Sequence, residues 1–86
     1  MNYIVGDIGN TSVKISILNH KFDIKKSYYI DTNKLYNKKN IVKLFEKFLN
    51  KNLNKKVLFS SVVPKVFKII KAYLKKKNYK LYEIKD

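Results

Sequence analysis

The chain has 86 residues, a length that holds one small domain and no more. Hydrophobic residues make up 45% of it and aromatic residues 14%, which is enough apolar material for a globular core and argues against a disordered chain. It contains no cysteine, so a disulfide framework and a cysteine-based zinc site are excluded.

The net charge is +14, and all 20 residues that carry the positive charge are lysines. A strongly basic small domain raises the hypothesis of a nucleic-acid partner. The lysines are spread along the chain, however, and arginine, whose planar fork suits phosphate and base recognition, is absent. A drift of the codons toward A and T also explains the abundant lysine, asparagine and isoleucine. We favour this compositional origin and expect no nucleic-acid partner, and we keep a basic nucleic-acid-binding or regulatory module as the alternative function.

The first seven residues, Met1 to Asp7, contain no basic segment that leads into a long apolar run. We therefore expect neither a signal peptide nor a transmembrane helix. The expected location is the cytoplasm, without a membrane partner.

Three strands are predicted at the start of the chain. Residues 3–8 are mostly apolar and indicate a short buried strand. Gly9 and Asn10 follow and predict a tight turn, because both tolerate positive φ. Residues 12–18 alternate apolar and polar side chains, as a half-buried strand does. After a second turn, residues 22–30 are predicted to form the third strand.

The hydrophobic period then changes to that of a helix. Asn40 is the expected cap of a helix that runs to about Leu53, ended by the polar segment 54–56. Its apolar stripe consists of Ile41, Leu44, Phe45, Phe48 and Leu49. Residues 57–63 form a continuous apolar run that is typical of a central parallel strand. Pro64 suits the first turn of a second helix, which Asn78 ends, and residues 79–84 are predicted to form the last strand.

The predicted order is βββαβαβ, in an α/β domain with a mixed five-stranded sheet. Hairpins connect the first three strands, and right-handed crossovers place the fourth strand beside the first, so the sheet order is 3-2-1-4-5. Both helices then cover the same face. The opposite face also carries apolar residues, and sheets of this kind are normally covered on both faces. We therefore expect a further helix to be missing after the last strand.

The segment Asp7-Ile8-Gly9-Asn10-Thr11-Ser12 carries the most chemical information. Asp7 ends an apolar strand, where a carboxylate is costly unless it is solvated or paired, and it can hold Mg²⁺ directly or through water. The turn that follows offers short polar side chains and successive backbone N–H groups, which can cradle phosphate oxygens. Lys14 adds a positive charge on the outgoing strand. The plainer interpretation is an ordinary hairpin turn. The candidate phosphate-binding residues are Asp7, Ile8, Gly9, Asn10, Thr11, Ser12, Val13 and Lys14.

Two segments resemble motifs of the type III pantothenate kinases. Asp7-Ile8-Gly9-Asn10-Thr11 is similar to the first phosphate motif of the superfamily of actin, sugar kinases and heat-shock chaperones, and Ser60-Ser61-Val62-Val63-Pro64 resembles a second segment of that kinase family. The implied fold is a ribonuclease-H-like or actin-like ATPase half-domain. The implied activity is ATP-dependent phosphorylation of pantothenate, the first step of coenzyme A biosynthesis. The resemblance also implies Mg²⁺, a monovalent cation (K⁺ or NH₄⁺) and a homodimer.

The two segments are expected to meet in space. The first and fourth strands should be parallel neighbours, so Asp7, Ser60 and Ser61 come together at their carboxyl ends, where open α/β sheets bind ligands. The helix that begins at Pro64 would point its positive end at the same crevice. The alternative for Ser60 and Ser61 is that small residues merely relieve packing beside the hairpin.

Other parts of the family pattern are missing. The resemblance implies a Gly-x-Asp-Arg motif beyond the fifth strand, whose aspartate acts as general base, then a glycine-rich segment and a second phosphate motif. None of these occurs in the sequence, and Asp86 lacks the flanking glycine and arginine. We therefore assign no catalytic residue. Residues 1–86 are expected to be a single, truncated amino-terminal nucleotide-binding half-domain that is inactive alone.

Overall fold

The computed structural model describes residues 1–47, 49 and 52–85. Within these residues a five-stranded sheet carries two α-helices and a short 3₁₀ helix. In chain order the elements are β1 (Asn2–Ile8), β2 (Ser12–Leu18), β3 (Ile24–Asp31), η1 (Thr32–Tyr36), α1 (Lys38–Glu46), β4 (Leu53–Ser61), α2 (Pro64–Lys76) and β5 (Lys80–Glu83).

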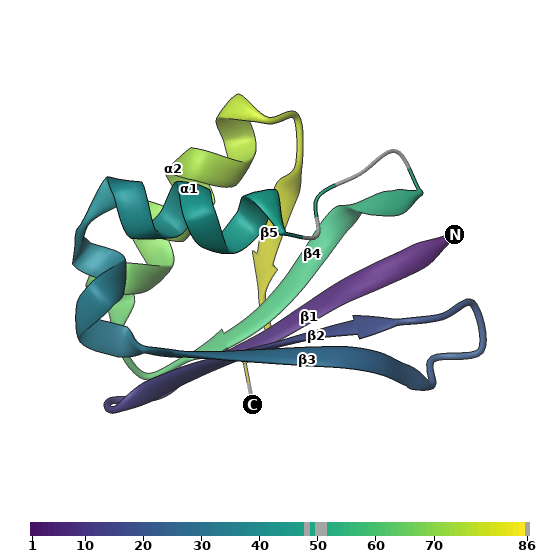
Figure 1. Cartoon of the computed structure of the whole chain (residues 1–86), viewed down its shortest axis with the longest axis horizontal. Helices are drawn as coiled ribbons and strands as arrows, with labels where there is room; N and C mark the ends of the chain where they lie inside the picture. The colour runs from purple at the N-terminus through teal and green to yellow at the C-terminus, as the bar shows by residue number, and fades with distance from the viewer. Residues whose placement is uncertain (48, 50–51, 86) are drawn as a thin grey trace.

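The sheet has the order β3-β2-β1-β4-β5, which confirms the predicted topology. The first three strands are antiparallel neighbours, and β4 pairs parallel with both β1 and β5. Figure 1 shows α1 and α2 together on one side of the sheet, as the two crossover connections require. The carboxyl ends of β1 and β4 therefore lie side by side, with Asp7 in register with Ser60.

The core lies between the sheet and the two helices. Alternate residues of the strands point toward the helices and are buried, because successive strand side chains face opposite sides. Both helices contribute one apolar stripe each, as the helical period predicts. The largest fully buried side chains are Ile4, Ile8, Val13, Ile15, Leu35, Ile41, Phe45, Leu53, Val57, Phe59, Ile70 and Leu74.

The first helix begins earlier than the sequence predicted. Asn37, and not Asn40, is the N-cap of α1, and its side chain accepts a hydrogen bond from the Lys39 N–H at 2.9 Å. Asn40 lies inside the helix and donates its side-chain amide to the Lys34 carbonyl. The reason is the short helix η1, which follows β3 directly and leaves Asn37 as the extended residue between two helices. No helix in the described part of the chain is long and apolar enough to cross a membrane.

The fourth strand also begins earlier, and the predicted helix end at Leu53 is wrong. Leu53 is buried as the first residue of β4, and the polar segment 54–56 continues the strand instead of breaking it. Pairing with β1 explains this, since the Asn2 N–H donates to the Asn52 carbonyl at 2.8 Å and Asn2 is in register with Leu53. Strand pairing overrides weak intrinsic propensity. Phe48, which was placed in the helical stripe, and Asp86 lie outside the described residues.

Two turns use residues in the left-handed region. Phe22, predicted to begin the third strand, has φ 67° and lies in the β2–β3 turn, so β3 starts at Ile24. Asn78 also has φ 67° and follows α2, where the Tyr79 N–H donates to the Leu74 carbonyl. Asparagine tolerates this conformation at the end of a helix. The prediction that Pro64 begins α2 and Asn78 stops it is therefore confirmed to within a turn.

The side of the sheet away from α1 and α2, the uncovered face, carries apolar side chains, as predicted. Leu58 in β4 and Tyr82 in β5 are in register on this face and are 43% and 38% exposed. With residues of β1 and β2 they line a shallow hollow of about 300 Å³. Its walls include Tyr3, Val5, Leu18, Phe22, Leu58 and Tyr82.

Candidate functional site

The turn between β1 and β2 is short and closed by a backbone hydrogen bond. The Gly9 N–H donates to the Ser12 carbonyl at 2.9 Å. A Cβ at Gly9 would lie 3.1 Å from the same oxygen, which is tighter than nine in ten real Cβ contacts. Neither Gly9 nor Asn10 has positive φ, so that part of the turn prediction is wrong. Glycine is favoured here by the close approach of two backbone segments, and not by a left-handed conformation.

Thr32, the first residue of η1, is hydrogen-bonded to this turn. Its hydroxyl donates to the Gly9 carbonyl at 2.7 Å, and its backbone N–H donates to the Thr11 carbonyl at 2.9 Å. Thr32 is only 2% exposed. Two carbonyls of the turn are therefore fixed by one buried residue that is about twenty positions away in the sequence.

Asp7 and Ser60 meet at the carboxyl ends of β1 and β4. The Ser60 hydroxyl donates to Asp7 Oδ1 at 2.8 Å. Both side chains point to the uncovered face, and the Asp7 side chain is exposed. The other carboxylate oxygen, Oδ2, takes no part in this hydrogen bond. The carboxylate is thus solvated and hydrogen-bonded, which removes the cost of placing it at the end of an apolar strand.

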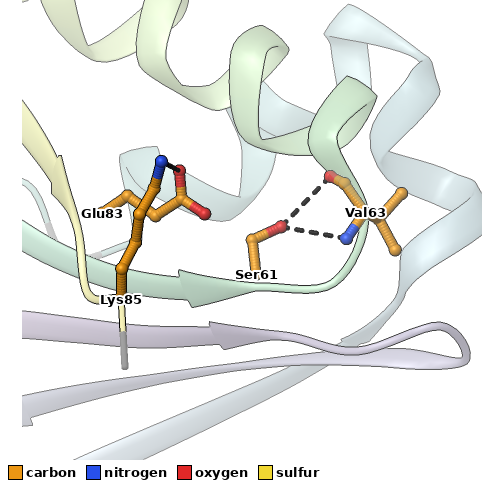
Figure 2. Close-up of polar contacts among 4 residues, drawn as sticks. All are labelled: Ser61, Val63, Glu83 and Lys85. Carbon is orange, nitrogen blue, oxygen red and sulfur yellow. Dashed lines mark hydrogen bonds and ion pairs between the residues drawn. The ribbon is translucent and has the colours of Figure 1, made fainter.

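Ser61 lies on the other side of the sheet. Figure 2 shows its hydroxyl directed at Val63, where α2 begins. The hydroxyl accepts from the Val63 N–H and donates to the Val63 carbonyl, both at 3.1 Å. Adjacent residues of a strand face opposite sides, so only one of the two serines can reach Asp7. The expectation that both serines meet Asp7 is correct for Ser60 and wrong for Ser61.

The exposed pair of Glu83 and Lys85 nearby, 4.0 Å apart, is a surface contact of little energetic weight.

The remaining candidate residues divide by face. Ile8 and Val13 are fully buried in the core, so only their backbone groups are available to a ligand. Asn10, Thr11, Ser12 and Lys14 are exposed. Lys14 is in register with Asp7 on the uncovered face, and its ammonium lies 5.8 Å from the centre of the Tyr29 ring.

The arrangement of Asp7, Ser60 and Lys14 contains one carboxylate, that of Asp7. Among the described residues no group of three or more His, Cys, Asp or Glu side chains is placed to hold a metal ion. Mg²⁺ in phosphoryl-transfer sites is commonly held by one or two carboxylates, with substrate phosphates and waters as the other ligands. An exposed Asp7 beside a turn of N–H donors fits that kind of partial site.

Sequence reasoning missed two residues that shape this region. Thr32 falls just beyond the predicted third strand, and nothing in the local sequence signals its contact with Gly9. Gly6 lies in β1 opposite Phe59, and a Cβ there would fall 2.4 Å from the ring. A glycine inside a strand is the available sign of such a close approach.

Comparison with known proteins gives a consistent result. A family model described as type III pantothenate kinase matches residues 3–85. A type III pantothenate kinase from Pelagibacter ubique (strain HTCC1062) is 43% identical over 83 residues. This match covers 95% of the chain but only 32% of the relative, so the chain spans about a third of that protein's length.

A solved structure shares the fold at low sequence identity. The Lmo2764 protein from Listeria monocytogenes, provisionally named an N-acetylmannosamine kinase, superposes with a TM-score of 0.57 at 11% identity. The match covers 96% of this chain and 34% of the other. At this identity the likeness concerns the fold alone. With the observed strand order it supports the expected actin-like ATPase half-domain.

Proposed function

The chain belongs to the type III pantothenate kinase family, and from this premise we propose that it supplies the first phosphate-binding motif of an ATP-dependent pantothenate kinase. The site consists of the exposed turn between β1 and β2, with Asp7, Lys14 and Ser60 beside it. In the complete enzyme the reaction would transfer the γ-phosphoryl group of ATP to pantothenate, the first step of coenzyme A biosynthesis.

The observation that carries the proposal is the hydrogen bond between Ser60 and Asp7. It joins the two sequence segments that resemble the family's motifs, which are 53 residues apart in the chain. It also lies at the carboxyl ends of parallel neighbouring strands, the edge at which open α/β sheets bind ligands.

Each group at this edge has a separate task. The N–H groups of the turn donate to phosphate oxygens, and Lys14 adds a positive charge on the same face as Asp7. Ser60 holds Oδ1 of Asp7, and the carboxylate, which is exposed on the uncovered face, would hold Mg²⁺ directly or through water. Bound Mg²⁺ would neutralise charge on the phosphates. Catalysis of this kind depends on positioning and on charge stabilisation.

Further properties of the complete family protein are also part of this proposal. They are the pantothenate site, a monovalent cation (K⁺ or NH₄⁺), a homodimer and a cytoplasmic location. The Gly-x-Asp-Arg motif that the family resemblance implies as the source of the general base does not occur in these 86 residues. We therefore propose that this chain binds ATP phosphates but does not phosphorylate pantothenate alone.

The test is calorimetric titration of the chain with Mg·ATP, with Asp7→Asn as the variant. Because removing the carboxylate charge removes the proposed metal ligand, the dissociation constant should rise by at least about tenfold, which corresponds to about 1.4 kcal/mol. Asp23→Asn is the matched control. Asp23 is exposed in the β2–β3 turn, at the opposite end of β2, so the same charge change there should leave the affinity unchanged. Equal affinities for the two variants would contradict the proposal.

A further inference from the structure

Thr32 makes two contacts to the hairpin turn, and both are to carbonyl oxygens. Its hydroxyl reaches the Gly9 carbonyl at 2.7 Å and its N–H reaches the Thr11 carbonyl at 2.9 Å. A methyl-bearing side chain that is 2% exposed cannot move freely. The hydrogen bonds therefore fix the orientation of two peptide groups, Gly9–Asn10 and Thr11–Ser12.

The orientation of a carbonyl sets that of the following N–H. No peptide bond in the described residues is cis, and in a trans peptide the C=O and N–H point in opposite directions. With the Gly9 carbonyl directed at Thr32, the Asn10 N–H points away from Thr32. By the same geometry the Ser12 N–H points away from β3, toward the β1 side of the hairpin.

The strand register shows to which face of the sheet the Asn10 N–H points. Ser12 pairs with Asp31, and both are exposed on the uncovered face, so the next residue, Thr32, lies on the helix-covered side, where it is buried. The Asn10 N–H is consequently directed to the uncovered face. Asp7 and Ser60 present their side chains to that same face.

We infer that Thr32 is a positioning residue, which aims the N–H groups of Asn10 and Ser12 at the oxygens of a bound polyphosphate. The inference rests on the proposed function, because it takes the hairpin as the phosphate site. Donors that are held in place before the anion arrives need no reorganisation on binding, and this raises their electrostatic value. Thr32 itself touches no ligand and acts only through the two carbonyls.

The experiment compares Thr32→Val with Thr32→Ser in the 86-residue chain. Valine keeps the shape but removes the hydroxyl, whereas serine keeps the hydroxyl and loses only a methyl group. The probe is inorganic tripolyphosphate with Mg²⁺ at moderate salt, where binding to scattered surface lysines is screened. Dissociation constants are taken from the ¹⁵N–¹H shifts of the Asn10 and Ser12 amides alone. Leu35→Val, in the buried part of η1, reports the effect of lost stability without a change at the carbonyls.

We expect Thr32→Val to weaken binding at these two amides by about tenfold, with Thr32→Ser and Leu35→Val near the original affinity. If the Thr32→Val variant is folded and binds as tightly as the original chain, the positioning role is overturned, but the proposed phosphate site is not contradicted. If Leu35→Val weakens binding as much as Thr32→Val, the effect comes from stability and the inference is again wrong. If tripolyphosphate shifts neither amide in the original chain, the proposed phosphate site and this inference both fail.

Discussion

Gly6 lies in the middle of β1, directly opposite Phe59 of β4, and the Phe59 ring occupies the space that a side chain at Gly6 would need. A Cβ built on Gly6 would lie 2.4, 2.5 and 2.6 Å from three atoms of the Phe59 ring. Real Cβ contacts essentially never fall below 3.0 Å, so the ring or the strand must shift in a Gly6→Ala variant. Phe59 has no exposed surface and is enclosed by the core. The substitution therefore adds volume to a packed region, where a shift of the Phe59 ring must disturb the surrounding core.

The expected cost follows from these contacts. Inserting a methyl group into a packed core costs about 1–3 kcal/mol, and contacts with three ring atoms place this case at the upper end. Replacing glycine by alanine inside a strand also stabilises the fold by about 0.5–1 kcal/mol, because alanine loses less backbone entropy on folding. The net loss in the free energy of unfolding should be about 2 kcal/mol. For a domain of this size, that loss lowers the midpoint of thermal unfolding by roughly 8–16 °C.

Thermal unfolding followed by circular dichroism measures the shift. Gly9→Ala is the matched control, because its Cβ meets one carbonyl oxygen at 3.1 Å and should lower the midpoint less. Phe59→Leu removes the ring, so the double variant Gly6→Ala/Phe59→Leu should be more stable than the sum of the two single changes predicts. A midpoint for Gly6→Ala within about 2 °C of the original chain, or strictly additive changes, would refute the steric argument.

Three further predictions concern the helix cap, the activity and the uncovered face. Asn37→Ala should lower the free energy of unfolding by about 1 kcal/mol in urea titrations, and a larger loss for Asn40→Ala would contradict the assignment of the cap. The isolated chain should show no ADP release that depends on pantothenate, because the motif proposed to supply the general base does not occur in these 86 residues and loss of such a base alone costs about 10²–10⁴-fold; any such turnover would refute this. Because apolar side chains are exposed on the uncovered face, the chain should self-associate in sedimentation experiments at moderate salt, and Leu58→Lys should reduce the association. A monodisperse monomer of the original chain would show that this face needs no partner.

The order of the strands and the meeting of Asp7 with Ser60 were predictable from the sequence. The alternation of residues 12–18 shows which side chains share a face, and crossover handedness places the fourth strand beside the first. Because adjacent residues of any strand face opposite sides, Ser60 and Ser61 in the fourth strand cannot both face Asp7. The prediction that both serines meet Asp7 overlooked this, and the structure shows the Ser61 hydroxyl bonded to Val63 instead.

The tertiary structure alone decided the contacts between segments that are distant in the chain. Helix α1 begins at Lys38 because η1 turns the chain after β3, and β4 begins at Leu53 because β1 offers a partner for it. Local propensity contains neither fact, since a strand is stabilised by its neighbour as much as by its own residues. The hydroxyl of Thr32 finds the Gly9 carbonyl for the same reason. A single residue can fix a turn about twenty positions away only once the sheet has brought the two together, and no period or spacing in the sequence encodes that distance.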